Sequence, residues 1–282
     1  GVEGMMSLGA CAGFMVGYAT DSFLLALAAA FLAGLGGALI YAVLTVTFLA
    51  NQNVAGLTLT IFGGGLANFI GYFMLGSSES GSLKLPEGIA AALGNVRIPV
   101  LSDLPVVGPL LFQYNPFVYI ALAIAVACGV YLYRTKTGLN VQAIGENPGA
   151  ADAASIQVNR WKYVNILLGG GICGIGGAYC SMIINGGVWL ADSVGGLGWI
   201  AVALVIFAAW KPQLAIFGSF VFGGLRVLKY YTPSGLAGIP IAFYDMLPFL
   251  ITALVLVVSS MRRSAASRVP GSLGVNYFRE ER

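Results

Sequence analysis

Histidine is absent from this chain of 282 residues, and charged side chains make up only 9% of it. The absence of His removes the commonest general base and metal ligand. The four cysteines lie in apolar runs without a Cys-x-x-Cys pair, which disfavours a redox or metal centre. A Gly-x-x-x-x-Gly-Lys-Ser/Thr phosphate loop is also missing, so we do not expect the chain to hydrolyse ATP itself. These gaps argue against a membrane enzyme and predict no cofactor and no metal.

The scarcity of charge also excludes an ordinary soluble domain, in which about a quarter of residues are charged. Hydrophobic residues make up 58% of the chain and gather in long runs, which suit a hydrocarbon core of roughly 30 Å. The 40 glycines are spread through these runs, as is typical of closely packed helices in lipid. The sequence predicts an all-α polytopic membrane protein, with residues 1–282 forming one transmembrane domain. About eight transmembrane helices are expected, at Met5–Thr20, Phe23–Ala50, Leu57–Leu75, Phe117–Tyr133, Tyr163–Ile184, Gly198–Trp210, Leu214–Leu228 and Met246–Met261.

The start of the chain carries neither Met nor a charged leader, and its first apolar run is short. We expect the natural protein to have further residues upstream, including one more N-terminal span. The net charge of +3 is too small to indicate a nucleic-acid partner.

Lys and Arg residues predict the orientation of the spans. If the spans alternate and the loop 134–162 is cytoplasmic, that side holds ten Lys and Arg residues and the other side holds four. The loop 134–162 and the tail 262–282 are therefore predicted to face the cytoplasm, and the segment 76–116 to lie outside. This outer segment has five prolines among apolar residues. It is interpreted either as a folded external cap or as a docking surface for an external partner.

An internal repeat is indicated at a constant offset of 140 residues. GLGGA at 34–38 matches GIGGA at 174–178, and VAGL at 54–57 matches VGGL at 194–197. The span that holds Gly34 is predicted to run from outside to inside, and the span that holds Gly174 from inside to outside. Opposite directions of corresponding segments are the pattern of inverted repeats in transporters. Polar residues precede both second matches and are candidates for the substrate path, although they also suit ordinary loops. They are Asn51, Gln52 and Asn53 in one half, and Asp192 and Ser193 in the other.

Neutral polar residues are the main polar groups inside the predicted spans, Asn68 and Tyr72 among them. Ionisable groups in a membrane usually mark ion or charged-substrate paths. Their near absence favours a neutral, hydroxyl-bearing solute such as a nucleoside or sugar, and disfavours a proton-driven pump. Asn68 and Tyr72 are thus further candidates for the path, while hydrogen bonds between helices are the alternative interpretation.

The loop 134–162 is the one long polar interruption in the apolar sequence. Its centre reads Gly145-Glu146-Asn147-Pro148, followed by an alanine-rich stretch. Asn can cap the free amides of a first helical turn, and Pro suits the first helical position. A short helix on the charged side of a membrane protein is suited to docking into a groove on another protein.

The stretch AIGENPGAADAASI at 143–156 resembles the cytoplasmic coupling loop of ABC importer permeases of the branched-chain amino acid, ribose and nucleoside group. GVEGMMSLGA, IPVLSDLPVVGPLLF, GGLGWIAVALVIFAAWKP and DMLPFLITALVLV resemble the nucleoside-type branch of that group. The resemblance covers nearly the whole chain. It departs from the family pattern at Ser155, where Gly is usual, and in lacking the expected N-terminal span.

This resemblance implies a permease subunit of an ATP-driven importer in a bacterial inner membrane, most similar to nucleoside permeases. A cytoplasmic ATPase subunit, a second permease that is identical or related, and an external substrate-binding lipoprotein are the implied partners. A simple-sugar or branched-chain amino acid permease is the alternative. An autonomous channel or secondary transporter is the alternative from another class, but no membrane carboxylate cluster supports it. The residues implied to contact the ATPase are Gly145, Glu146, Asn147, Pro148, Ala150 and Ala151.

Overall fold

The computed structural model describes residues 1–76, 81–96, 113–228, 230–231, 240–262 and 270–278. Its regular structure is helical apart from one isolated antiparallel bridge between Lys84 and Val188. The chain forms two compact units. Unit 1 comprises 1–121, 155–196 and 274–282, and unit 2 comprises 122–154 and 197–273.

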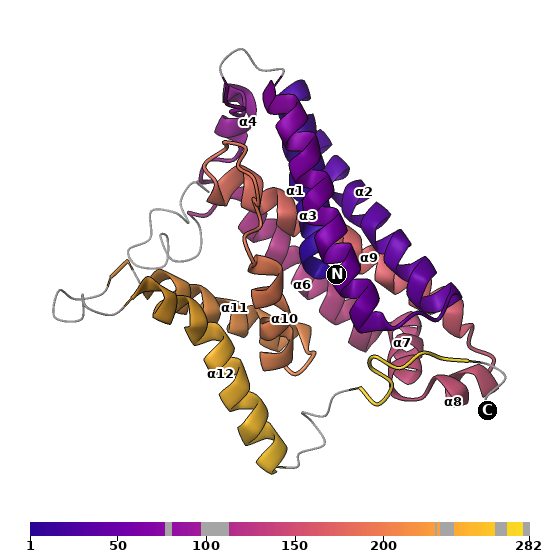
Figure 1. Ribbon diagram of the computed structural model, residues 1–282. Coiled ribbons are helices and arrows are strands. Elements are labelled where there is room, and N and C mark those ends of the chain that lie inside the picture. Colours follow the sequence, from indigo (N-terminus) through magenta and orange to yellow (C-terminus); the bar gives the residue numbers. More distant parts are fainter. Residues whose placement is uncertain (77–80, 97–112, 229, 232–239, 263–269, 279–282) are drawn as a thin grey trace. The chain divides into compact units, whose positions relative to one another are not determined.

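Unit 1 is built on four long helices, shown in Figure 1. They are α1 (Val2–Thr20), α2 (Phe23–Ala42), α3 (Gln52–Gly76) and α9 (Val158–Tyr179). A π-helical segment follows two of them, η1 (Val43–Thr47) after α2 and η2 (Cys180–Ile184) after α9. The short helix α4 (Glu87–Ala92) and the start of α6 (Pro116–Arg134) complete the unit.

Glycines allow the backbones of α1, α2 and α9 to meet directly. A Cβ added to Gly34 of α2 would lie 2.2 Å from the Gly170 carbonyl oxygen of α9, and one added to Gly174 would lie 2.1 Å from the Ala30 oxygen of α2. A Cβ added to Gly9 of α1 would lie 2.3 Å from the Gly174 Cα. Such contacts are possible only without side chains, as expected for helices packed in lipid.

The order of these contacts gives the directions of the helices. Residue 34 meets 170 while residue 30 meets 174, so α2 and α9 run antiparallel. Gly9 meets Gly174 and Gly13 meets Ala178, so α1 and α9 run in the same direction. The opposite directions expected for the spans that carry Gly34 and Gly174 are therefore present.

In its described residues, unit 2 contains the rest of α6 together with five further helices. They are α7 (Lys136–Glu146), α8 (Pro148–Ala153), α10 (Leu197–Phe207), α11 (Pro212–Leu228) and α12 (Ile241–Arg262). The helices α10, α11 and α12 contact one another, and the rings of Phe207 and Phe222 meet edge to face at 5.4 Å. Between α10 and α11, Ala209 and Trp210 have positive φ and lead into Pro212 at the start of α11.

The all-α membrane class is confirmed. Four helical stretches in the described residues are long and apolar enough to cross a membrane, at Phe23–Thr47, Gln52–Gly76, Pro116–Arg134 and Val158–Ile184. Shorter apolar helices lie at Leu197–Phe207, Pro212–Leu228 and Ala242–Val257. The chain is a multi-pass membrane protein, and the total of eight spans stays a prediction.

Part of the predicted outer segment 76–116 folds onto the core of unit 1. Leu83, Leu85 and Ile89 are at most 6% exposed and pack in the same apolar cluster as Phe14. The Asp21 carboxylate accepts a hydrogen bond from the Ile89 backbone amide at 2.6 Å, in the first turn of α4. Residues 81–96 thus form a folded cap, whereas the apolar stretch 98–112 lies outside the described residues.

Candidate functional site

The predicted coupling loop begins with a tight corner between α6 and α7. Thr135 caps α7, because its hydroxyl accepts a hydrogen bond from the Gly138 amide at 3.0 Å. The same hydroxyl donates to the Tyr131 carbonyl at 2.5 Å. A Cβ on Gly138 would lie 2.0 Å from that carbonyl oxygen, so only glycine fits here. The Gln142 side chain also donates to the Leu132 carbonyl, which holds α7 against the last turn of α6.

The short helix α8 starts where the sequence predicts it. The Asn147 side chain accepts a hydrogen bond from the Ala150 amide at 3.0 Å, and Pro148 occupies the first helical position. At the far end, Ser155 has a φ of 66°. Residues just past a helix end often take this left-handed conformation, which glycine adopts without strain. This accounts for the glycine expected at this position from the resemblance, and Ser155 adopts the same backbone at some conformational cost.

The predicted coupling residues differ in exposure. A docking surface needs exposed side chains, and three of the six supply them; Ala151 instead packs inward, at 3% exposure. The exposed residues are Glu146, Asn147 and Ala150, and the half-buried ones are Gly145 and Pro148. The outer face of the loop therefore combines one carboxylate with small side chains.

A second candidate site joins α3 to the segment between η2 and α10. The Asn68 side-chain amide donates to the Asp192 carboxylate at 2.8 Å, and the Asp192 backbone amide donates to the Asn68 side-chain oxygen at 3.0 Å. Tyr72 lies one turn further along α3 and is 81% exposed. One turn earlier, nothing lies within 4 Å of the place that a Cβ on Gly64 would occupy. The polar pair thus sits between an exposed ring and a bare stretch of backbone.

The segment that carries Asp192 is not helical, although it runs along a helix long enough to cross a membrane. Trp189 packs on Gly71 near the end of α3, where an added Cβ would lie 2.1 Å from the indole nitrogen. Seven residues later, the Gly196 amide donates to the Glu3 carboxylate in the first turn of α1 at 2.8 Å. Asn68 itself lies eight residues before the end of α3, or about 12 Å along the helix axis. Asp192 is therefore beside the interior of an apolar span.

Non-helical backbone at membrane depth is tolerated where protein covers it or where it lines a water-filled cavity. Trp189 and Val194 are covered, at 4% and 2% exposure. Asp192 is exposed and has a φ of 52°, a left-handed conformation. Strained residues of this kind cluster at ligand sites. Chemically, this arrangement offers a carboxylate to the hydroxyl groups of a solute beside an aromatic ring.

The predicted path residues do not form one group. Asn68, Tyr72, Asp192 and Ser193 lie together, and the Ser193 hydroxyl donates to the Leu190 carbonyl at 2.5 Å. The three residues 51–53 lie at the start of α3, about 22 Å along the helix from Asn68. There the Asn51 side chain accepts hydrogen bonds from the amides of Asn53 and Val54, at 3.0 and 3.2 Å, which is a helix cap. The predicted path residues therefore lie at two separate places along α3.

The chain matches a known family of transport proteins. The sequence profile of the family described as "Branched-chain amino acid transport system / permease component" matches residues 1–257. The chain belongs to this family. Members are ABC permease subunits, which are transport components that work with an ATPase and a binding protein. The permease resembles the putative glucose ABC transporter permease protein TsgC13 of Haloferax volcanii, with 32% identity over 99% of this chain and 88% of that protein.

Two further relatives of the permease carry names that state a nucleoside solute. The nucleoside ABC transporter permease protein NupC of Lactococcus lactis is 31% identical over all of this chain and 88% of its own length. The guanosine ABC transporter permease protein NupQ of Bacillus subtilis is 30% identical with the same coverage. No solved structure gives a significant match to the permease.

Several structural residues of the permease were not anticipated from its sequence. The helix α7 was missed, although Thr135 followed by Gly138 carries a capping signal. Glu3, which holds the Asp192 segment through Gly196, has no recognisable signal, because its partner lies 193 residues away. The tail residues Ser272 and Asn276, whose hydrogen bonds are described below, likewise belong to no motif.

Proposed function

We propose that the chain is the membrane-spanning permease subunit of an ATP-driven ABC importer that carries nucleosides. The observation that carries this proposal is the α7–α8 loop on a chain that matches a permease family over residues 1–257. Glu146, Asn147 and Ala150 form its exposed surface, and Asn147 caps α8. This surface docks into a groove on a separate ATPase subunit. That subunit supplies the driving energy, because this chain has no phosphate loop with which to hydrolyse ATP.

A nucleoside is the preferred solute for two reasons. Two relatives that align along the full chain are named for nucleoside and guanosine transport. The Asp192 carboxylate can accept hydrogen bonds from ribose hydroxyls, and the exposed Tyr72 ring can stack on a base. A simple sugar is the second candidate, because another relative is named for glucose and because a carboxylate binds sugar hydroxyls equally well.

The wider assembly is part of the same proposal. A second permease, identical or related, pairs with this chain in a bacterial inner membrane, and an external lipoprotein delivers the solute to segment 76–116. The loop 134–162 and the tail 262–282 lie in the cytoplasm. About eight spans of this chain form a single transmembrane domain over residues 1–282.

The repeat at offset 140 is proposed to be an inverted repeat. Its support is reciprocal contact: Gly34 approaches Gly170, and Gly174 approaches Ala30, which are equivalent pairs under that offset. The two helices run antiparallel, and each is followed by a π-helical segment. A two-fold axis through the α2–α9 crossing would produce this pattern.

The test uses the full complex in proteoliposomes, with ATP and a nucleoside-loaded binding protein. Ala150→Trp places a large ring on the exposed face of α8, so the loop no longer fits its groove. We expect nucleoside uptake to fall by roughly tenfold or more, which corresponds to about 1.4 kcal/mol, with unchanged thermal stability of the permease. Glu146→Gln tests the carboxylate in the same assay.

Ala121→Trp is the matched control, because it adds the same ring at another exposed alanine, on α6. Normal coupled uptake by the Ala150→Trp complex would refute the coupling role. Uptake of glucose that excess nucleoside does not inhibit would instead select the sugar permease.

A further inference from the structure

The described part of the C-terminal tail, Pro270–Phe278, attaches to the rest of the chain at two places. Figure 1 shows the first part of this yellow segment beside α7. The Ser272 amide donates to the Gly145 carbonyl at 2.9 Å, and its hydroxyl donates to the Glu146 carbonyl at 3.3 Å. The final carbonyls of a helix lack partners within the helix. Ser272 therefore caps α7 at the junction where α8 begins.

This first attachment is close-fitting. A Cβ added to Gly271 would lie 3.0 Å from the Glu146 carbonyl oxygen, so the neighbouring backbone also rests on the end of α7. The capped residues are the two that precede Asn147 in the coupling loop. The tail thus holds the base of α8 without covering its exposed alanines.

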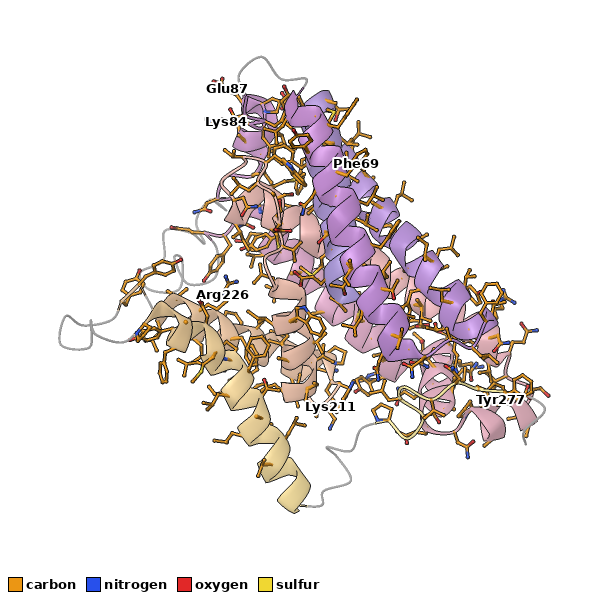
Figure 2. All side chains as sticks on the ribbon, in the orientation of Figure 1. Phe69, Lys84, Glu87, Lys211, Arg226 and Tyr277 are labelled. Atoms are coloured by element: carbon orange, nitrogen blue, oxygen red, sulfur yellow. The ribbon has the colours of Figure 1, made fainter. Side chains whose placement is uncertain are left out.

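The second attachment is to the link between η1 and α3. The Asn276 amide nitrogen donates to the carbonyls of Leu49 and Ala50, at 2.5 and 3.2 Å, and its oxygen accepts from the Gln52 side chain at 3.2 Å. Leu49 has a φ of 53°, so Asn276 holds a strained link. Beside it, the ring of Tyr277, labelled in Figure 2, faces the Lys162 ammonium of α9 at 5.9 Å.

We propose that Pro270–Phe278 is a strap that transmits movement between the coupling loop and α3. Only three residues separate Ser272 from Asn276, and a chain of four residues reaches at most about 14 Å. A displacement of α8 that pulls on Ser272 therefore also pulls on the start of α3, the helix that carries Asn68. This inference rests on the proposed function, because it assigns the driving displacement to an ATPase at α8.

The first test loosens the strap while leaving both attachments in place. Gly274 lies between them, is exposed, and has open space around it. A flexible Gly/Ser insertion of about six residues after Gly274 lengthens the tether. In the full complex, uptake should fall roughly tenfold, within the usual range of coupling between sites, while ATP hydrolysis continues. The same insertion after Phe278, which lies beyond both attachments and is 44% exposed, should leave uptake unchanged.

The second test needs neither ATPase nor solute, so it separates the strap from the proposed function. Asn276→Leu removes the attachment to the η1–α3 link. Amide hydrogen exchange in the purified full-length permease should then rise in Asn53 and Val54, and also in Ala150 and Ala151 of α8. An increase limited to Asn53 and Val54 would make Asn276 a local cap and would overturn the strap. Wild-type uptake after the Gly274 insertion would overturn it as well.

Discussion

At the scale of single residues, Asp192 combines a strained backbone with a charge beside an apolar span. Asp192→Asn preserves its shape and both contacts with Asn68, because the amide oxygen can still accept from the Asn68 side chain. The substitution removes only the negative charge that would bind a solute hydroxyl. Hydrogen bonds to charged groups contribute about 1.5–3 kcal/mol, so we expect KM for nucleoside uptake to rise at least roughly tenfold. The measurement is initial uptake rate against solute concentration in proteoliposomes.

The control for Asp192 is Asp245→Asn on α12, which makes the same change at an exposed carboxylate of unit 2. The KM of this control variant should match that of the unsubstituted permease. Both variants should have the same melting temperature as the unsubstituted permease. An unchanged KM for Asp192→Asn would leave Asp192 with a purely structural role, in which its backbone amide and carboxylate hold the segment to α3.

At the scale of elements, the contact of α1, α2 and α9 depends on Gly174. Gly174→Ala would place a methyl group 2.1 Å from the Ala30 carbonyl oxygen, which forces the helices apart. Overpacking of this kind costs about 1–3 kcal/mol, so the free energy of unfolding should fall by that amount. Gly169→Ala on the same helix meets nothing within 4 Å and should be neutral or stabilising, because alanine favours helix. Equal destabilisation of both variants in denaturant titrations would contradict direct backbone packing at Gly174.

The sequence predicts the long elements well, because apolar length and glycine spacing are local properties. The predicted span at Tyr163–Ile184 corresponds to α9 and η2, and α8 begins at Asn147-Pro148 as its capping chemistry requires. The helix α7 escaped prediction because its two glycines look like loop residues. Gly138 is in fact required by the close approach to Tyr131, a contact that only the folded corner reveals.

The candidate path shows where local reasoning ends. Asn68 and Asp192 are 124 residues apart, and nothing in their spacing indicates that they pair. The constant offset of 140 residues relates positions in the two halves by symmetry. It does not show which residues are in contact. The repeat relates Asn51, Gln52 and Asn53 to the Asp192 region, but they lie at the start of α3, away from Asn68.

At the scale of the whole molecule, the directions of the helices in unit 1 limit how the chain can cross a membrane. The helices α1 and α9 run together and α2 runs against them, so fixing the direction of one helix fixes the others. The excess of Lys and Arg on the side of the loop 134–162 predicts that this side is cytoplasmic. Cysteine labelling in intact cells can test this orientation, starting from a variant in which Cys11, Cys128, Cys173 and Cys180 are replaced.

Single cysteines introduced at exposed positions then show which side of the membrane each position faces. Glu87→Cys on α4 should react with a membrane-impermeant maleimide in intact cells, and Leu139→Cys on α7 should react only after permeabilisation. Leu139 is 58% exposed, so burial would not explain its protection. The reverse labelling pattern would place α7 and α8 outside the cell, where no cytoplasmic ATPase could reach Ala150. The coupling role of the loop and the predicted orientation therefore stand or fall on the same measurement.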